Sequence, residues 1–223
     1  MKKALLIVSV AVFGLSFGGG EQAVSTFTDK RDGKVYRIVK IGRQIWFAEN
    51  LNYAAKGSVC YGEGGKIVTY YDERPMPTVT ILSNAEAQAN CAKYGRLYNW
   101  ETARAACPAG THLPADKEWT TLVDYVGGDL KAGTKLKSPT GWNSQSGVPA
   151  GTDEYGFSAL PGGDGYADGS FSSAGKYGAW WSATESNNDR DAWGRYMFYD
   201  LEPMGRDPND KVYLFSVRCV VDN

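Results

Sequence analysis

The feature that most constrains the possible fold of this chain is the combination of an apolar leader with four cysteines. Two lysines precede an apolar run from Ala4 to Phe17, and small residues follow it. This order is typical of a bacterial secretory signal, and the run is short for a membrane span. We expect residues 1–20 to be a signal peptide and residues 21–223 to form one domain. The mature chain would have no stable membrane span and would lie at the outer membrane surface or outside the cell.

An exported chain meets an oxidising compartment, where an even number of cysteines predicts disulfide bonds. The four cysteines are Cys60, Cys91, Cys107 and Cys219. Three pairings are possible, and sequence spacing alone does not choose among them. The count therefore predicts a domain held by two disulfides, without assigning them.

The charge balance and the scarcity of histidine limit the classes of partner. The 24 basic and 25 acidic side chains give a formal charge of -1, with no long run of either sign, so we expect no nucleic-acid partner. His112 is the one histidine, which leaves no zinc constellation once the cysteines pair. We predict no metal and no cofactor. Asp164 and Asp168 flank a glycine turn, and whether calcium binds there stays open.

Local patterns predict an α+β domain. Residues 34–41 and a second strand through Trp46 flank the Gly42-Arg43 turn of a hairpin, and residues 54–83 are punctuated by glycine and proline as in a long loop. Two central helices are expected, over residues 100–107 and 116–126. Beyond Gly128, short aromatic runs separated by glycine, serine and asparagine favour short antiparallel strands and long loops.

The segment "AWWSATES" places two tryptophans side by side in one of these strands. Alternate residues of a strand point to opposite faces, so Trp181 shares a face with Ala183 and Trp180 shares one with Ser182. We predict that Trp181 is a core residue and that Trp180 is exposed and able to stack on a sugar ring. The alternative is that both tryptophans are buried, on two sides of a sheet.

Catalytic readings of the same region are weaker, and we predict that the chain is not an enzyme. A nucleophilic Ser182 would need His112 as its base, and His112 lies in a segment expected to be a buried strand. Glu185 with Asp189 or Asp191 could form an acid pair, but any exposed acidic loop offers such pairs. A solvated loop is the better interpretation.

Several long motifs resemble a known family. They are "DGKVYRIVKIGRQIWFAENLNY", "YGRLYNWETARAACPAGTHLPADKEWTTL", "GFSALPGG", "GAWWSATES" and a final "FSVRCV". From about Phe27 to Val221 the chain resembles the Fibrobacter succinogenes major paralogous domain family, which in turn resembles the C-type lectin fold. That resemblance implies pairing of Cys107 with Cys219 and of Cys60 with Cys91.

The same resemblance implies an exported, non-catalytic module that binds at the cell surface. Plant cell-wall polysaccharide is the expected partner, because aromatic side chains interleaved with polar residues suit carbohydrate contact. The alternative is a structural protein of the cell envelope that acts through protein-protein contacts. The residues predicted to contact the ligand are Trp142, Trp180, Trp193 and Tyr196.

Overall fold

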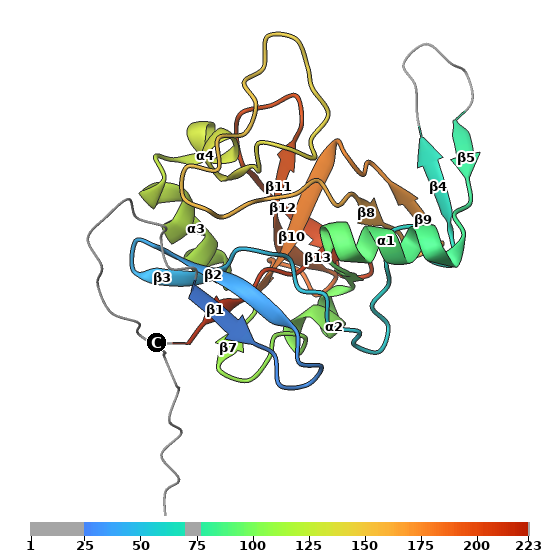
Figure 1. Cartoon of the computed structure of the whole chain (residues 1–223), viewed down its shortest axis with the longest axis horizontal. Helices are drawn as coiled ribbons and strands as arrows, with labels where there is room; N and C mark the ends of the chain where they lie inside the picture. Colours follow the sequence, from blue (N-terminus) through green and yellow to red (C-terminus); the bar gives the residue numbers. More distant parts are fainter. Residues whose placement is uncertain (1–24, 70–76, 223) are drawn as a thin grey trace, which may run out of the picture.

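The computed structural model describes residues 25–69 and 77–222 (Figure 1). The expected signal peptide, residues 1–20, lies outside these ranges. The helices are α1 (Asn84–Tyr94), α2 (Trp100–Arg104), α3 (Asp116–Tyr125) and α4 (Asp129–Leu136). The strands are β1 (Ser25–Thr28), β2 (Val35–Ile41), β3 (Gln44–Phe47), β4 (Lys66–Thr69), β5 (Thr78–Thr80), β6 (Leu97–Tyr98), β7 (Thr111–His112), β8 (Asp164–Gly165), β9 (Ser170–Ser172), β10 (Tyr177–Glu185), β11 (Asp191–Phe198), β12 (Gly205–Asp210), β13 (Phe215–Ser216) and β14 (Val220–Val221).

The strands form three sheets. The first has the order β1-β2-β3-β14-β7, the second β12-β11-β10-β13-β6, and the third β5-β4-β9-β8. Most neighbouring pairs are antiparallel, as predicted, but β10 pairs with β13 and β4 pairs with β9 in parallel. The expected hairpin of β2 and β3 is present, with Ile41 opposite Gln44 across the turn.

Helices cover both faces of the second sheet. On one face Trp181 packs in a core with Trp100 of α2, Phe215 and Cys219. On the other face Trp180 packs in a core with side chains from α3 and α4. The β10 strand therefore lies between two cores, one shared with α2 and the other with α3 and α4. No helix among the described residues is long and apolar enough to cross a membrane.

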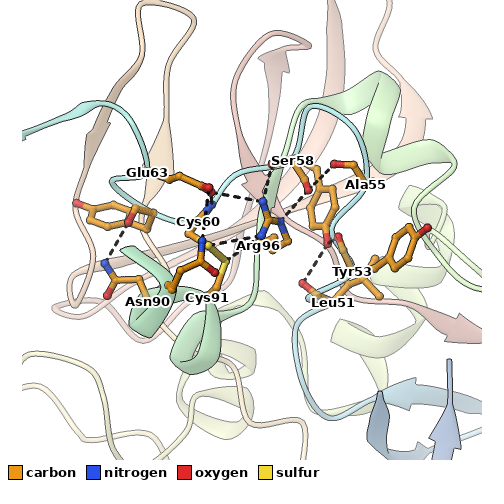
Figure 2. Close-up of a disulfide and its surroundings, with 12 residues drawn as sticks. Leu51, Tyr53, Ala55, Ser58, Cys60, Glu63, Asn90, Cys91 and Arg96 are labelled. Atoms are coloured by element: carbon orange, nitrogen blue, oxygen red, sulfur yellow. Dashed lines mark hydrogen bonds and ion pairs between the residues drawn. A yellow bond between two sulfur atoms is a disulfide. The ribbon is translucent and has the colours of Figure 1, made fainter. Parts of the chain in front are cut away.

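Two disulfides join segments that are distant in the sequence. Cys107, just beyond α2, is bonded to Cys219, next to the last strand, and Cys60 is bonded to Cys91 of α1. This is the pairing that the family resemblance implies. Figure 2 shows the guanidinium of Arg96 beside the second bond, with its Nη1 3.6 Å from both sulfur atoms. The same guanidinium donates to the Oγ and the carbonyl of Ser58, so it fixes the loop around the disulfide.

The described chain has four helices where two were predicted. The missed α1 is capped by Ser83, whose side chain accepts from the N–H of Glu86 while Glu86 accepts from the N–H of Ser83. This capping box is visible in the sequence as S-N-A-E. The missed α4 contains Gly133, where a β-carbon would overlap the backbone of residues 202 and 203. The glycine that weakens the helical pattern is required by this close approach.

The segment predicted as one long loop contains a hairpin. Residues 54–83 include β4 and β5, which pair with Val68 opposite Val79. In Figure 1 this hairpin projects from the body of the molecule, and β5 is an edge strand. The predicted helix over residues 100–107 also ends earlier, at Arg104.

Candidate binding surface

Trp180, predicted to be an exposed stacking residue, is fully buried, and that prediction is wrong. Its indole N–H donates to Asn50 Oδ1 at 2.9 Å inside the core formed with α3 and α4. The physical reason is that these helices cover the face that was expected to meet solvent. Trp181 is also fully buried, on the other face. The alternative, with both tryptophans buried on two sides of a sheet, is confirmed.

The other three predicted contact residues do not share one surface. Trp193 and Tyr196 are both half-buried residues of β11, but their spacing of three residues places them on opposite faces. One face of the Trp193 ring is covered by the guanidinium of Arg206, 3.3 Å from the ring centre. Trp142 is half-buried against the α3 and α4 core, and its N–H donates to the carbonyl of Ala159.

Tyr196 belongs instead to a group of neighbouring aromatic side chains, here named the tyrosine surface. Its members are half-buried or exposed, and they are Tyr166, Tyr177, Tyr196, Phe198 and Tyr213. The ring centres of Tyr177 and Phe198 are 4.8 Å apart, and those of Tyr196 and Phe198 are 5.6 Å apart. Tyr166 and Tyr213 form a second contact at 5.4 Å.

Tyr177 is in ring contact with both Tyr196 and Phe198. Burial raises the pKa of its hydroxyl well above the ordinary value, and the charges of Asp164 and Asp207 and the hydroxyls of Tyr166 and Tyr196 raise it further. At neutral pH the ring stays protonated, so its hydroxyl can donate a hydrogen bond.

Two carboxylates accompany the rings. Tyr196 Oη donates to Asp207 Oδ2 at 2.8 Å, and Tyr166 Oη donates to Asp164 Oδ2 at 2.9 Å. Asp207 is exposed, whereas Asp164 is buried. Burial raises the pKa of Asp164, and the hydrogen bonds from Ser172 and Tyr166 only partly oppose that. The surface thus combines flat apolar rings with hydrogen-bond acceptors and donors.

The backbone holds the rings in place. Tyr196 lies across Gly205 of the neighbouring strand, where a β-carbon would overlap the ring. The buried Lys137 donates through Nζ to the carbonyls of Phe198 and Leu201, which ties the end of β11 to the body of the domain. A surface built on paired strands and anchored at its end is preorganised for contact.

The aspartates considered for calcium have other partners. Asp168 accepts from the backbone N–H and the hydroxyl of Ser170, and Asp164 accepts from Ser172 and Tyr166. Within residues 25–69 and 77–222, no group of three or more acidic, histidine or cysteine side chains is arranged to hold a metal ion.

The residues considered for catalysis lie in separate environments. Both ring nitrogens of His112 face carboxylates, with Nδ1 2.6 Å from Asp222 Oδ1 and Nε2 2.9 Å from Glu118 Oε1. Ser182 is fully buried, and its Oγ accepts from the N–H of Thr184. His112 is therefore held by Asp222 and Glu118 and makes no hydrogen bond with Ser182.

Of the five members of the tyrosine surface, only Tyr196 was among the predicted contact residues. The alternation in "AWGRYMFYD" places Phe198 on the same face of a strand as Tyr196, so this part could have been found. Tyr213 reaches the group through the tertiary fold and left no local pattern.

Comparison with known proteins places the chain in a family. No curated protein and no solved structure matches it significantly. The family model of the Fibrobacter succinogenes major domain matches residues 39–221, which include every member of the tyrosine surface and all four cysteines. That range covers most of the chain, so the protein belongs to the Fibrobacter succinogenes major domain family.

Proposed function

We propose that this protein is an exported, non-catalytic binding module of the cell surface that contacts plant cell-wall polysaccharide through the tyrosine surface. The observation that carries the proposal is the mutual contact of Tyr177, Tyr196 and Phe198 beside the exposed Asp207, together with the Tyr166 and Tyr213 pair beside Asp164. A further support for a non-catalytic role is the separation of Ser182 from His112.

The chemistry of such a surface fits sugars. A pyranose ring presents apolar C–H faces, which pack on aromatic rings, and a rim of hydroxyls, which pair with carboxylates and phenols. Tyrosine suits both demands because its ring is apolar and its hydroxyl is polar. Tyr177, Tyr196 and Phe198 lie within 6.0 Å of one another between ring centres, and Asp207 is exposed beside them.

A C-type-lectin-like architecture is part of this proposal. Its support is the bond of Cys107, which follows α2, to Cys219 beside the last strand. The order of helix, short strand β7, second helix α3, long loops and final strand is also what such an architecture requires.

Retention on insoluble wall polysaccharide tests the proposal. Tyr196→Ala and Phe198→Ala should each weaken retention, because they remove adjoining parts of the same surface. Trp193→Ala is the matched control, since Trp193 lies on the opposite face of the same strand. We expect the control to bind like the parent. If all variants were retained equally and their melting temperatures were unchanged, the tyrosine surface would not be the binding surface.

The alternative function, a structural role in the cell envelope, is favoured by one specific feature. The β5 edge strand and the residue after it expose Val79 by 57% and Ile81 by 78%. Exposed apolar edge strands can pair with strands of other proteins. A cross-linker attached at Val79 without introducing a new cysteine, and used on intact cells, would test this alternative. Capture of an envelope protein, together with no polysaccharide retention by the parent, would favour this alternative.

A further inference from the structure

A cavity of about 410 Å³ lies away from the tyrosine surface. It is bounded by β2, the segment after β3, the carboxyl end of α1 and the loop around residues 138–160. The polar residues that matter in its lining are Lys34, Arg37, Glu49, Asn50, Lys93 and Ser158. Its volume is in the range of sites that hold small ligands. We name it the basic cavity.

Positive charge exceeds negative charge in this lining. Lys34, Arg37 and Lys93 face one carboxylate, Glu49, which already accepts from Arg37 Nε at 2.9 Å. Among the described residues, no carboxylate lies within 4.0 Å of the Lys34 or Lys93 ammonium group. These two cations are available to a ligand.

A buried cation lies directly behind the lining. Arg218 is fully buried, and its guanidinium donates to Asn50 Oδ1 and to the carbonyls of Phe47, Phe157 and Ser158. Asn50 and Ser158 both line the cavity, so the guanidinium is one residue layer from it.

None of the groups that accept from Arg218 is a carboxylate. Burial lowers its pKa to about 9, and the charges of Asp153 and Glu49, which make no hydrogen bond with it, only partly oppose that. A buried guanidinium whose hydrogen-bond partners are all neutral is costly, and an anion in the cavity would add negative charge near it.

We propose that the basic cavity binds a carboxylate-bearing sugar, a uronate unit of an acidic wall polysaccharide. Lys34 and Lys93 would pair with the carboxylate near the exposed rim, and the hydroxyls of Ser138 and Thr140, which also line the cavity, would meet sugar hydroxyls. The inference rests on the proposed function for its ligand class. The positive charge of the cavity favours any anion, and in a wall polysaccharide the anionic unit is a uronate.

Calorimetric titration of the purified exported protein with a galacturonate trimer tests the inference. The matched ligand is the same trimer with its carboxyls methyl-esterified, which keeps the sugar and removes the charge. We expect the free acid to bind and the ester to bind about tenfold more weakly or worse. Acetate at the same ionic strength should not compete, because it lacks the sugar. Equal binding of acid and ester, or full competition by acetate, would overturn the inference.

Paired variants locate the binding. Lys34→Gln with Lys93→Gln should weaken galacturonate binding about tenfold and reduce its dependence on salt. Lys56→Gln is the control, since Lys56 is exposed and does not line the cavity. Full binding by the double variant would place the ligand elsewhere and contradict the inference.

The failure of this inference differs from failure of the proposed function. If neutral wall polysaccharide is retained and galacturonate does not bind, the basic cavity is excluded while the tyrosine surface stands. If galacturonate binds in the cavity but Tyr196→Ala leaves retention unchanged, the tyrosine surface fails while the cavity stands.

Discussion

Trp180 and Trp181 are neighbours in the chain, yet their indole rings lie in different cores on opposite faces of β10. Each indole N–H has a buried acceptor. Trp180 donates to Asn50 Oδ1 at 2.9 Å, and Trp181 donates to the carbonyl of Tyr98 at 2.8 Å. Consecutive residues of this strand thus pack into the two cores of the domain.

Replacing either tryptophan should be strongly destabilising. We expect Trp180→Ala and Trp181→Ala each to lower the free energy of unfolding by about 3 to 5 kcal/mol, because each empties a core site. Leu130→Ala, at a residue that is 77% exposed, should change it by within about 0.5 kcal/mol. Urea denaturation of the three variants measures this. A small loss for Trp180→Ala would contradict its burial.

The two disulfides should differ in what their removal costs. In the loop-entropy model, a bond that closes 112 residues stabilises by about 5 kcal/mol and one that closes 31 residues by about 4. We therefore expect Cys107→Ala with Cys219→Ala to be less stable than Cys60→Ala with Cys91→Ala. Denaturation midpoints of both double variants decide the order. The reverse order would show that Arg96 and its loop depend on the shorter bond.

His112 should titrate above its ordinary pKa of 6.5. Burial acts to lower this pKa, but the hydrogen bonds to Asp222 and Glu118 outweigh it and raise the pKa. Because the folded value is higher than the unfolded one, the stabilisation is complete below pH 6.5 and is lost as the pH rises through the folded value. The ring is 41% exposed, so we expect less than about 1 kcal/mol.

Nuclear magnetic resonance titration of the His112 ring checks this expectation. Asp222→Asn should lower the measured pKa, because it removes a charge 2.6 Å from Nδ1. An unchanged pKa in that variant would mean that the contact is not made in solution.

Lys137 should make folding stability depend on pH in the opposite direction, and in a more alkaline range. Burial lowers its pKa from 10.5 to about 8, so between these values the unfolded chain binds a proton that the folded chain has released. Stability from this group therefore rises with pH across that window. Relative to Lys137→Met, which cannot titrate, the parent should gain stability from pH 8 to pH 10. Parallel curves for parent and variant would be the contrary result.

Local patterns predicted the elements whose causes are local. The β2 and β3 hairpin follows from the Gly42-Arg43 turn between alternating strands, and α3 follows from Trp119, Leu122, Val123 and Val126 at helical spacing. This hairpin and this helix need few contacts with distant residues. The mixed fold and the two disulfides are also confirmed, but the disulfides join distant segments, and their pairing was implied by the family resemblance.

The candidate site was less predictable because its members meet only in the folded chain. Whether Trp180 faces solvent depends on α3 and α4, which come from elsewhere in the sequence. Tyr166 and Tyr213 are 47 positions apart by their numbers and meet through their rings. The basic cavity likewise combines Lys34 with Lys93 and Ser158. No short segment of the sequence contains all the members of either site.

The position of the last strands has a consequence for the order of events during synthesis. In the first sheet β14 lies between β3 and β7, with Val220 opposite both Trp46 and His112, and in the second sheet β13 lies between β10 and β6. Neither sheet can close before residues 215–221 have been made. Long-range pairing of this kind folds slowly. Both sheets therefore stay incomplete until these last strands have been translated.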